Sequence, residues 1–164
     1  MTGLLRQLWA QPAGGYPFRP LAQMCAAWAD EFEQDYATAD PESRIDPGLA
    51  RAGIELFRTL PGTADSQVLL CTDLHADNIL AAQRAPWLVI DPKPYTGDPA
   101  YDVLQHMLNC EERLAANPAG LADRMAGLAG LDASRVRQWL FARSVQESAG
   151  SPLMRQVATR LAPA

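Results

Sequence analysis

The segment that decides the fold is VLLCTDLHADNILAAQRAPWLVIDPKPYTGDPAYD, residues 68–102. Two apolar runs, QVLLC at 67–71 and PWLVID at 86–91, are bounded by turn-forming residues, which predicts two strands. NILAA at 78–82 is a candidate third strand. Between the first two runs, the loop CTDLHADN collects two acids, an amide, a histidine and a cysteine within eight positions. We therefore expect polar chemistry to be concentrated in a small strand-loop-strand insert.

Apolar residues on both sides of this insert recur with a helical period. The pattern predicts helices at 2–10, 19–37, 47–60, from about Asp98 onward, and at 119–129, 133–148 and 152–162. Asp132 or Ser134 is the expected N-cap of the helix at 133–148. The predicted fold class is α+β and mostly helical, with a small β-hairpin insert that carries the polar loops.

Composition limits the kind of protein. A chain of 164 residues with 48% hydrophobic and 20% charged residues predicts a single folded domain over 1–164. The net charge of -5 counts against a nucleic-acid partner, and no apolar window approaches the length of a membrane span. The three cysteines, Cys25, Cys71 and Cys110, are widely spaced and odd in number, which favours a reducing cytoplasm over a disulfide framework.

Three polar residues of the insert indicate a specific chemistry. If the runs at 67–71 and 86–91 pair, Asp73, Asn78 and Asp91 meet at one end of a hairpin. Carboxylate and carboxamide oxygens suit a hard cation such as Mg²⁺, and a further carboxylate can accept a proton from an attacking hydroxyl. Asn78 follows Asp73 by five positions and Asp91 follows Asn78 by thirteen, which agrees with the protein-kinase signature. Turn formation is the alternative role for these residue types.

The same stretch resembles the aminoglycoside phosphotransferase superfamily, and more narrowly the aminoglycoside/hydroxyurea antibiotic resistance kinases of the streptomycin 6-kinase type. TDLHADNIL is similar to the catalytic loop of that family, and VIDPKPYTGDPAYD to its metal loop and following helix. The flanking stretches PFRPLAQMCAAWADEFE and WLFARSVQES are also similar, so the resemblance runs over nearly the whole chain. It implies a protein-kinase-like C-terminal lobe.

The resemblance also implies roles for individual residues. Asp73 would be the catalytic base that orients the acceptor hydroxyl toward the γ-phosphate of ATP. Asn78 and Asp91 would hold Mg²⁺ between the phosphates. Asp102 would receive backbone N–H bonds from the catalytic loop, and His75 would brace the loop, so both would give structural support. The implied reaction is ATP-dependent phosphorylation of a small-molecule hydroxyl.

The expected acceptor is a cationic aminoglycoside such as streptomycin, by resemblance. Glu147, in VQES, is the preferred acid for binding it, and an ordinary surface acid is the alternative. Lys93 could contact a phosphate or be a solvated lysine.

Three departures from the family pattern matter. Cys71 stands where the family usually has His, and Asp77 where a small or other polar residue is common. Nothing upstream of Pro20 supplies a glycine-rich loop or a strand lysine, so we expect the C-terminal lobe alone, without the N-terminal nucleotide-binding lobe. Such a chain would have impaired activity and an exposed apolar interface through which it could associate.

Two further hypotheses stay open. The chain could be a non-catalytic helical binding module, or degenerate kinase relative, that keeps the loop but not the reaction. Alternatively, Cys71, His75, His106 and Cys110 could form a zinc set, although structural zinc sites usually contain a pair of closely spaced cysteines.

Overall fold

The computed structural model describes residues 2–10 and 17–163. Its helices are α1 Thr2–Trp9, α2 Leu21–Thr38, α3 Pro47–Thr59, α4 Pro99–Asp102, α5 Leu104–Leu108, α6 Glu111–Ala116, α7 Pro118–Ala129, α8 Ala133–Gln146 and α9 Pro152–Leu161. Its strands are β1 Arg19–Pro20, β2 Val68–Leu70, β3 Ile79–Ala81, β4 Trp87–Val89 and β5 Tyr95–Gly97. The fold is therefore α+β and mostly helical, as the sequence predicts.

The pairing of the strands differs from the prediction. β2 pairs antiparallel with β5, with Leu70 opposite Tyr95, and β5 also pairs in parallel with β1. β4 pairs instead with β3, with Ile79 opposite Val89. The expectation that 67–71 pairs with 86–91 is therefore wrong. Only residues 82–86 separate β3 from β4, so this hairpin closes over a short loop at low entropic cost.

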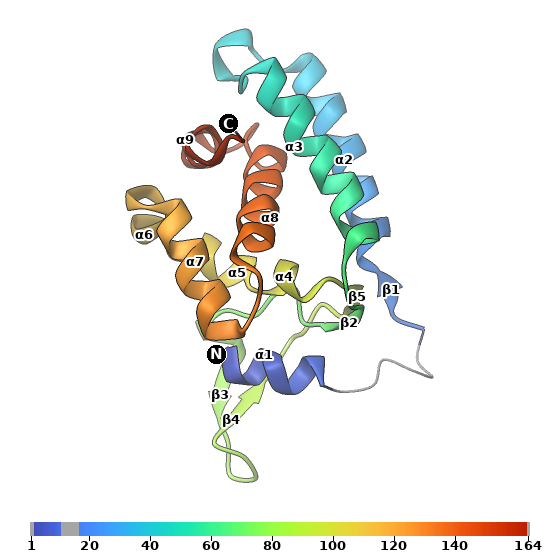
Figure 1. Ribbon diagram of the computed structural model, residues 1–164, viewed down its shortest axis with the longest axis vertical. Helices are drawn as coiled ribbons and strands as arrows, with labels where there is room; N and C mark the ends of the chain where they lie inside the picture. Colours follow the sequence, from blue (N-terminus) through green and yellow to red (C-terminus); the bar gives the residue numbers. More distant parts are fainter. Residues whose placement is uncertain (1, 11–16, 164) are drawn as a thin grey trace.

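The helices form two groups on either side of α8 (Figure 1). α2 and α3 run side by side on one side of α8, and α7 lies on the other. A Cβ at Gly53 would lie 2.4 Å from a methyl group of Val145, so the absent side chain permits the close approach of α3 and α8. Trp139 packs edge-on against Phe57 and Tyr101 at centroid distances of 6.1 and 5.0 Å, which places α8 in the core.

Local signals account for several helix starts. Asp132 caps α8 by accepting the Arg135 N–H at 2.7 Å, so Asp132 and not Ser134 is the N-cap. Asp46 caps α3, and Pro47 occupies its first turn. The helical pattern that starts near Asp98 is divided among the short helices α4, α5 and α6.

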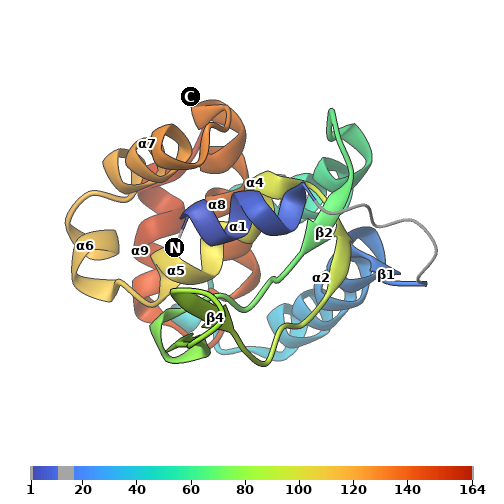
Figure 2. The same ribbon diagram turned by 90° about the horizontal axis from the view of Figure 1, so that it is seen from below.

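Seen from below, α1 crosses the molecule beside the β3–β4 hairpin (Figure 2). It packs against β2 and α7, elements that lie far from it in the sequence. Within residues 2–10 and 17–163, no helix has the length and apolar character needed to cross a bilayer.

Candidate functional site

Asp102 holds the backbone of the loop that follows β2. Its Oδ2 accepts the Cys71 N–H at 3.1 Å and its Oδ1 accepts the Thr72 N–H at 2.6 Å. The indole Nε1–H of Trp9 also donates to Oδ2, at 2.9 Å. Burial raises the pKa of Asp102, while the three N–H donors act in the opposite direction. Trp9 was not foreseen from the sequence, because no local pattern connects residues that lie 93 positions apart.

The loop is also bonded to the segment that follows β4. The Lys93 N–H donates to the Cys71 carbonyl at 2.9 Å, and the Thr72 hydroxyl donates to the Lys93 carbonyl at 2.6 Å. Thr72 and Asp91 have φ values of 54° and 46°, and they are the non-glycine residues with positive φ in the described part of the chain. This conformation is unfavourable for side chains with a Cβ and is frequent at functional sites.

Hydrogen bonds join Asn78 to Asp73 and to the end of β4 just before Asp91, through a different strand pairing from the predicted one. The buried Asn78 donates its Nδ2–H to the Asp73 carbonyl at 2.9 Å. The Asn78 carbonyl accepts the N–H of Ile90, the residue before Asp91, at 3.0 Å. In the described chain no donor is hydrogen-bonded to Asn78 Oδ1. An amide oxygen such as Asn78 Oδ1 and a carboxylate such as that of Asp91 are ligand types that Mg²⁺ takes, and this ion needs few protein ligands because it keeps several waters.

Two basic side chains lie near these acids. His75 lies between Asp73 and Asp77, with Nε2 3.9 Å from Asp73 Oδ1 and Nδ1 3.6 Å from Asp77 Oδ2. These separations exceed normal hydrogen-bond lengths, so the contacts are electrostatic and depend on protonation of the imidazole. The Lys93 ammonium lies 2.7 Å from Asp91 Oδ2.

Cys71 lies on the side of the loop that faces α1. Cys71 is only 1% exposed to solvent, and it borders a cavity of about 200 Å³. The cavity is lined by apolar side chains: Leu4, Leu5, Leu8, Leu74, Val89 and Pro92. Burial raises the pKa of its thiol to about 11. A small apolar group suits these surroundings, so the Cys71 side chain acts as core packing beneath the loop.

The zinc hypothesis gains no support from these positions. His106 Nε2 and Cys110 Sγ lie 4.0 Å apart beyond α4, whereas Cys71 is buried against α1. In the part of the chain that is described, no group of three or more His, Cys, Asp or Glu side chains is arranged to hold a metal. Asn78 and Asp91 supply one amide and one carboxylate, so they do not count as such a group.

Glu147 lies at the C-terminal end of α8, where it pairs with the Arg143 guanidinium. Arg143 also donates to Gln146 Oε1 at 3.0 Å and lies 4.2 Å above the ring of Trp28. None of the contacts found in the described chain joins Glu147 to the loop at 71–78. The structure thus places Glu147 in a side-chain cluster between α8 and α2.

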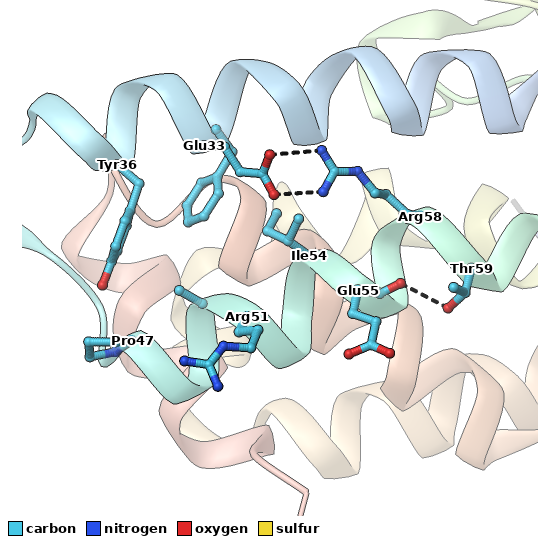
Figure 3. A pocket seen from close by; sticks show the side chains of 10 residues that line it. Glu33, Tyr36, Pro47, Arg51, Ile54, Glu55, Arg58 and Thr59 are labelled. Atoms are coloured by element: carbon cyan, nitrogen blue, oxygen red, sulfur yellow. Dashed lines mark hydrogen bonds and ion pairs between the residues drawn. The ribbon is translucent and has the colours of Figure 1, made fainter.

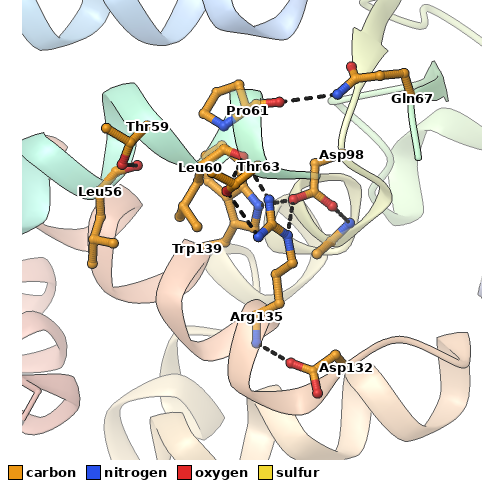
Figure 4. A network of polar contacts seen from close by, with 11 residues as sticks. Leu56, Thr59, Leu60, Pro61, Thr63, Gln67, Asp98, Asp132, Arg135 and Trp139 are labelled. Atoms are coloured by element: carbon orange, nitrogen blue, oxygen red, sulfur yellow. Dashed lines mark hydrogen bonds and ion pairs between the residues drawn. The ribbon is translucent and has the colours of Figure 1, made fainter. Parts of the chain in front are cut away.

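A buried polar network fixes the start of α4 (Figure 4). Asp98, 2% exposed, accepts the Trp139 indole N–H at 2.6 Å and the Arg135 Nε–H at 2.5 Å. Arg135 also donates to the Leu60 carbonyl at 2.6 Å, after the end of α3. This set, called the Asp98 network, joins α3, α4 and α8. Because Asp102 lies one helical turn after Asp98, the network fixes the helix that holds the loop.

Two surface grooves lie outside this polar site. One, of about 500 Å³, lies between α2 and α3, and no residue of 68–102 lines it (Figure 3). Arg58 bridges its rim, bonded to both Glu33 and Asp30 at 2.6 Å, so one guanidinium faces two carboxylates and the cluster keeps a net negative charge. The second, of about 480 Å³, lies between α1 and the β3–β4 hairpin. The hairpin exposes the apolar side chains of Leu80, Trp87 and Leu88, of which Trp87 lines this groove.

Comparison with known proteins is consistent with this geometry. The family model described as aminoglycoside/hydroxyurea antibiotic resistance kinase matches residues 1–152. A hydroxyurea phosphotransferase of Kitasatospora aureofaciens is 44% identical over 79 residues, which cover 48% of this chain and 22% of the relative. No solved structure matches the chain.

Longer matches join the chain to streptomycin 6-kinases. The enzyme of Streptomyces griseus is 32% identical over 155 residues, and that of Streptomyces glaucescens is 32% identical over 156. Each match covers 90% of this chain and 49% of the relative, so the chain spans about half the length of these relatives. The family match and these relatives agree with the resemblance found in the catalytic and metal loops: the chain belongs to the aminoglycoside/hydroxyurea antibiotic resistance kinase family.

Proposed function

We propose that this chain carries the catalytic and metal loops of an ATP-dependent O-phosphotransferase for a small-molecule hydroxyl. Its architecture would be that of a protein-kinase-like C-terminal lobe, folded as one domain. The observation that supports this proposal is the set of hydrogen bonds that joins Asn78 to Asp73 and to Ile90, the residue before Asp91, beside a backbone held by Asp102.

Asp73 is the proposed base. Its side chain is 28% exposed, so an acceptor hydroxyl can reach the carboxylate, which would orient that hydroxyl and accept its proton. His75 would limit the orientation of Asp73 from 3.9 Å away. Asp102 would act through the loop, because fixing the Cys71 and Thr72 amides fixes the backbone that leads into Asp73.

Asn78 and Asp91 are the proposed magnesium ligands. When bound, Mg²⁺ would neutralise charge on the ATP phosphates. The hydrogen bond from Asn78 to the Asp73 carbonyl couples the position of the metal ligand to that of the base. This coupling matters because phosphoryl transfer depends chiefly on positioning and electrostatic stabilisation.

The proposed acceptor is a cationic aminoglycoside such as streptomycin. The names of the relatives give streptomycin and hydroxyurea as the molecules they phosphorylate. Glu147 is the candidate acid for an aminoglycoside amine, since its side chain is 32% exposed although it is paired with Arg143. A cytoplasmic location is proposed, because the cysteines are odd in number and widely spaced along the sequence. The exposed apolar hairpin is the proposed surface for association with another protein segment.

The test begins with calorimetric titration of the chain with MgATP, followed by a phosphoryl-transfer assay with streptomycin and hydroxyurea. We expect Asp73→Asn to lower transfer by about 10²-fold or more while the circular dichroism spectrum is unchanged. Asp77→Asn is the matched control, because it removes a 94% exposed acid from the same loop. Retained transfer in Asp73→Asn would refute the role of the base. Absence of nucleotide binding would favour the non-catalytic binding module.

A further inference from the structure

The sequence contains a single lysine, Lys93, beside thirteen arginines. Its backbone is bonded to the loop on both sides, through the Cys71 carbonyl and the Thr72 hydroxyl. The Cα of Lys93 is therefore held beside the proposed base and metal ligands. Its side chain is 54% exposed and reaches to 2.7 Å from Asp91 Oδ2.

The charges around Lys93 are mostly negative. The same loops carry three acids, Asp73, Asp77 and Asp91. In the described residues no arginine forms an ion pair with any of them. A lysine amine is charged at neutral pH, so Lys93 places one positive charge beside Asp91. Three carboxylates repel an approaching polyphosphate unless cations lie between the carboxylates and the phosphates.

The ion pair between Lys93 and Asp91 can break easily, so that each side chain can take another partner. Both side chains are largely exposed, at 54% and 67%, and exposed pairs contribute little to stability. A divalent cation competes with the ammonium for the same carboxylate oxygen. A lysine ammonium on a flexible stem can move from one oxygen anion to another without loss of its charge.

We propose that Lys93 is a phosphate-binding residue that exchanges partners: it neutralises Asp91 before ligands bind and moves to the phosphate oxygens when a divalent cation takes that carboxylate. This proposal rests on the proposed function and adds to it a ligand-binding residue. The ligand class is a polyphosphate bound together with a divalent cation.

Affinity measurements on Lys93→Met test both halves of the exchange. By calorimetry, Mn²⁺ alone should bind about two- to fivefold more tightly, because the competing ammonium is gone. Inorganic triphosphate in saturating Mg²⁺ should bind about tenfold more weakly, because a charged hydrogen-bond donor is lost. Arg84→Met, which removes an exposed cation from the turn between β3 and β4, is the matched control and should change neither affinity.

The outcomes separate this proposal from the one it rests on. If the wild-type chain binds no Mn²⁺, or if Asp91→Asn binds it unchanged, the metal assignment fails and the Lys93 proposal fails with it. If Asp91→Asn abolishes Mn²⁺ binding but Lys93→Met binds Mn²⁺ no more tightly, only the Lys93 proposal fails. A purely structural role would weaken both affinities together.

Nuclear magnetic resonance provides a readout at the residue itself. Reductive methylation with ¹³C-formaldehyde labels Lys93 and the terminal α-amine and keeps both positively charged. The Lys93 methyl resonance should shift when Mg²⁺ is added and shift again with triphosphate, while the α-amine resonance is the internal reference. A Lys93 resonance that responds to neither addition overturns the exchange.

Discussion

Replacing Arg135 with methionine removes one side of the Asp98 network and keeps the aliphatic stem. Arg135 is 20% exposed at its side chain and Asp98 only 3%, so the change leaves a buried carboxylate without its cation. Removal of one partner from a buried ion pair costs about 3–5 kcal/mol. Because Asp98 keeps the Trp139 and Ala100 donors, we expect a loss near the lower end, about 3 kcal/mol.

Arg137→Met is the matched control on the same helix. Arg137 pairs with Asp123, but the two side chains are 48% and 40% exposed, so the expected loss of stability is much smaller than in Arg135→Met. Urea unfolding followed by circular dichroism measures both losses. In thermal unfolding, a chain of this size should lose about 6–12 °C in Arg135→Met. Equal losses in the two variants would refute the importance assigned to the Asp98 network.

A double-mutant cycle tests whether the loss comes from the contact itself. Asp98→Asn and Arg135→Met should be non-additive by at least about 1 kcal/mol, because each removes the same ion pair. Strict additivity would show that Arg135 stabilises the chain through its other hydrogen bonds.

Three other changes follow from the same structure. Gly53→Ala should destabilise the chain by about 2 kcal/mol, because its Cβ would meet a side chain of α8. Gly127→Ala, with open space around it, should stabilise the chain by about 0.5–1 kcal/mol. Calorimetric melting would show these opposite signs, and equal signs would contradict the packing argument. Burial raises the pKa of Asp102 in the folded chain, so this group contributes stability that is complete below its ordinary pKa of 3.8 and lost as pH rises through the raised value. Urea unfolding at several pH values should therefore show that stability falls less with rising pH in Asp102→Asn than in the wild-type chain. The same pH dependence of stability in both would count against the raised pKa. Iodoacetamide should modify Cys110 in the native chain and Cys71 only after unfolding, because Cys71 is 1% exposed and its thiol has a pKa of about 11. Mass spectrometry measures the labelling, and early labelling of Cys71 would show that the loop opens.

The sequence by itself determined the long helices and the composition of the polar loop. A stripe with a period of 3.6 residues specifies which face of a segment is buried, so α2, α3 and α8 follow from local patterns. Asp132 as the cap of α8 is equally local, because a cap bonds to an amide within the same turn. The spacing of Asp73, Asn78 and Asp91 was sufficient to suggest the chemistry, and the resemblance of TDLHADNIL and VIDPKPYTGDPAYD suggested the family.

The tertiary structure alone decided which distant segments meet. An apolar run predicts a strand but not its partner, so the sequence did not distinguish pairing of β2 with β4 from the observed pairing with β5. The bonds that join Trp9 to Asp102 and Arg135 to Asp98 connect residues 93 and 37 positions apart. Such contacts have no periodic signature, because they depend on how the helices pack rather than on the neighbours of each residue along the chain.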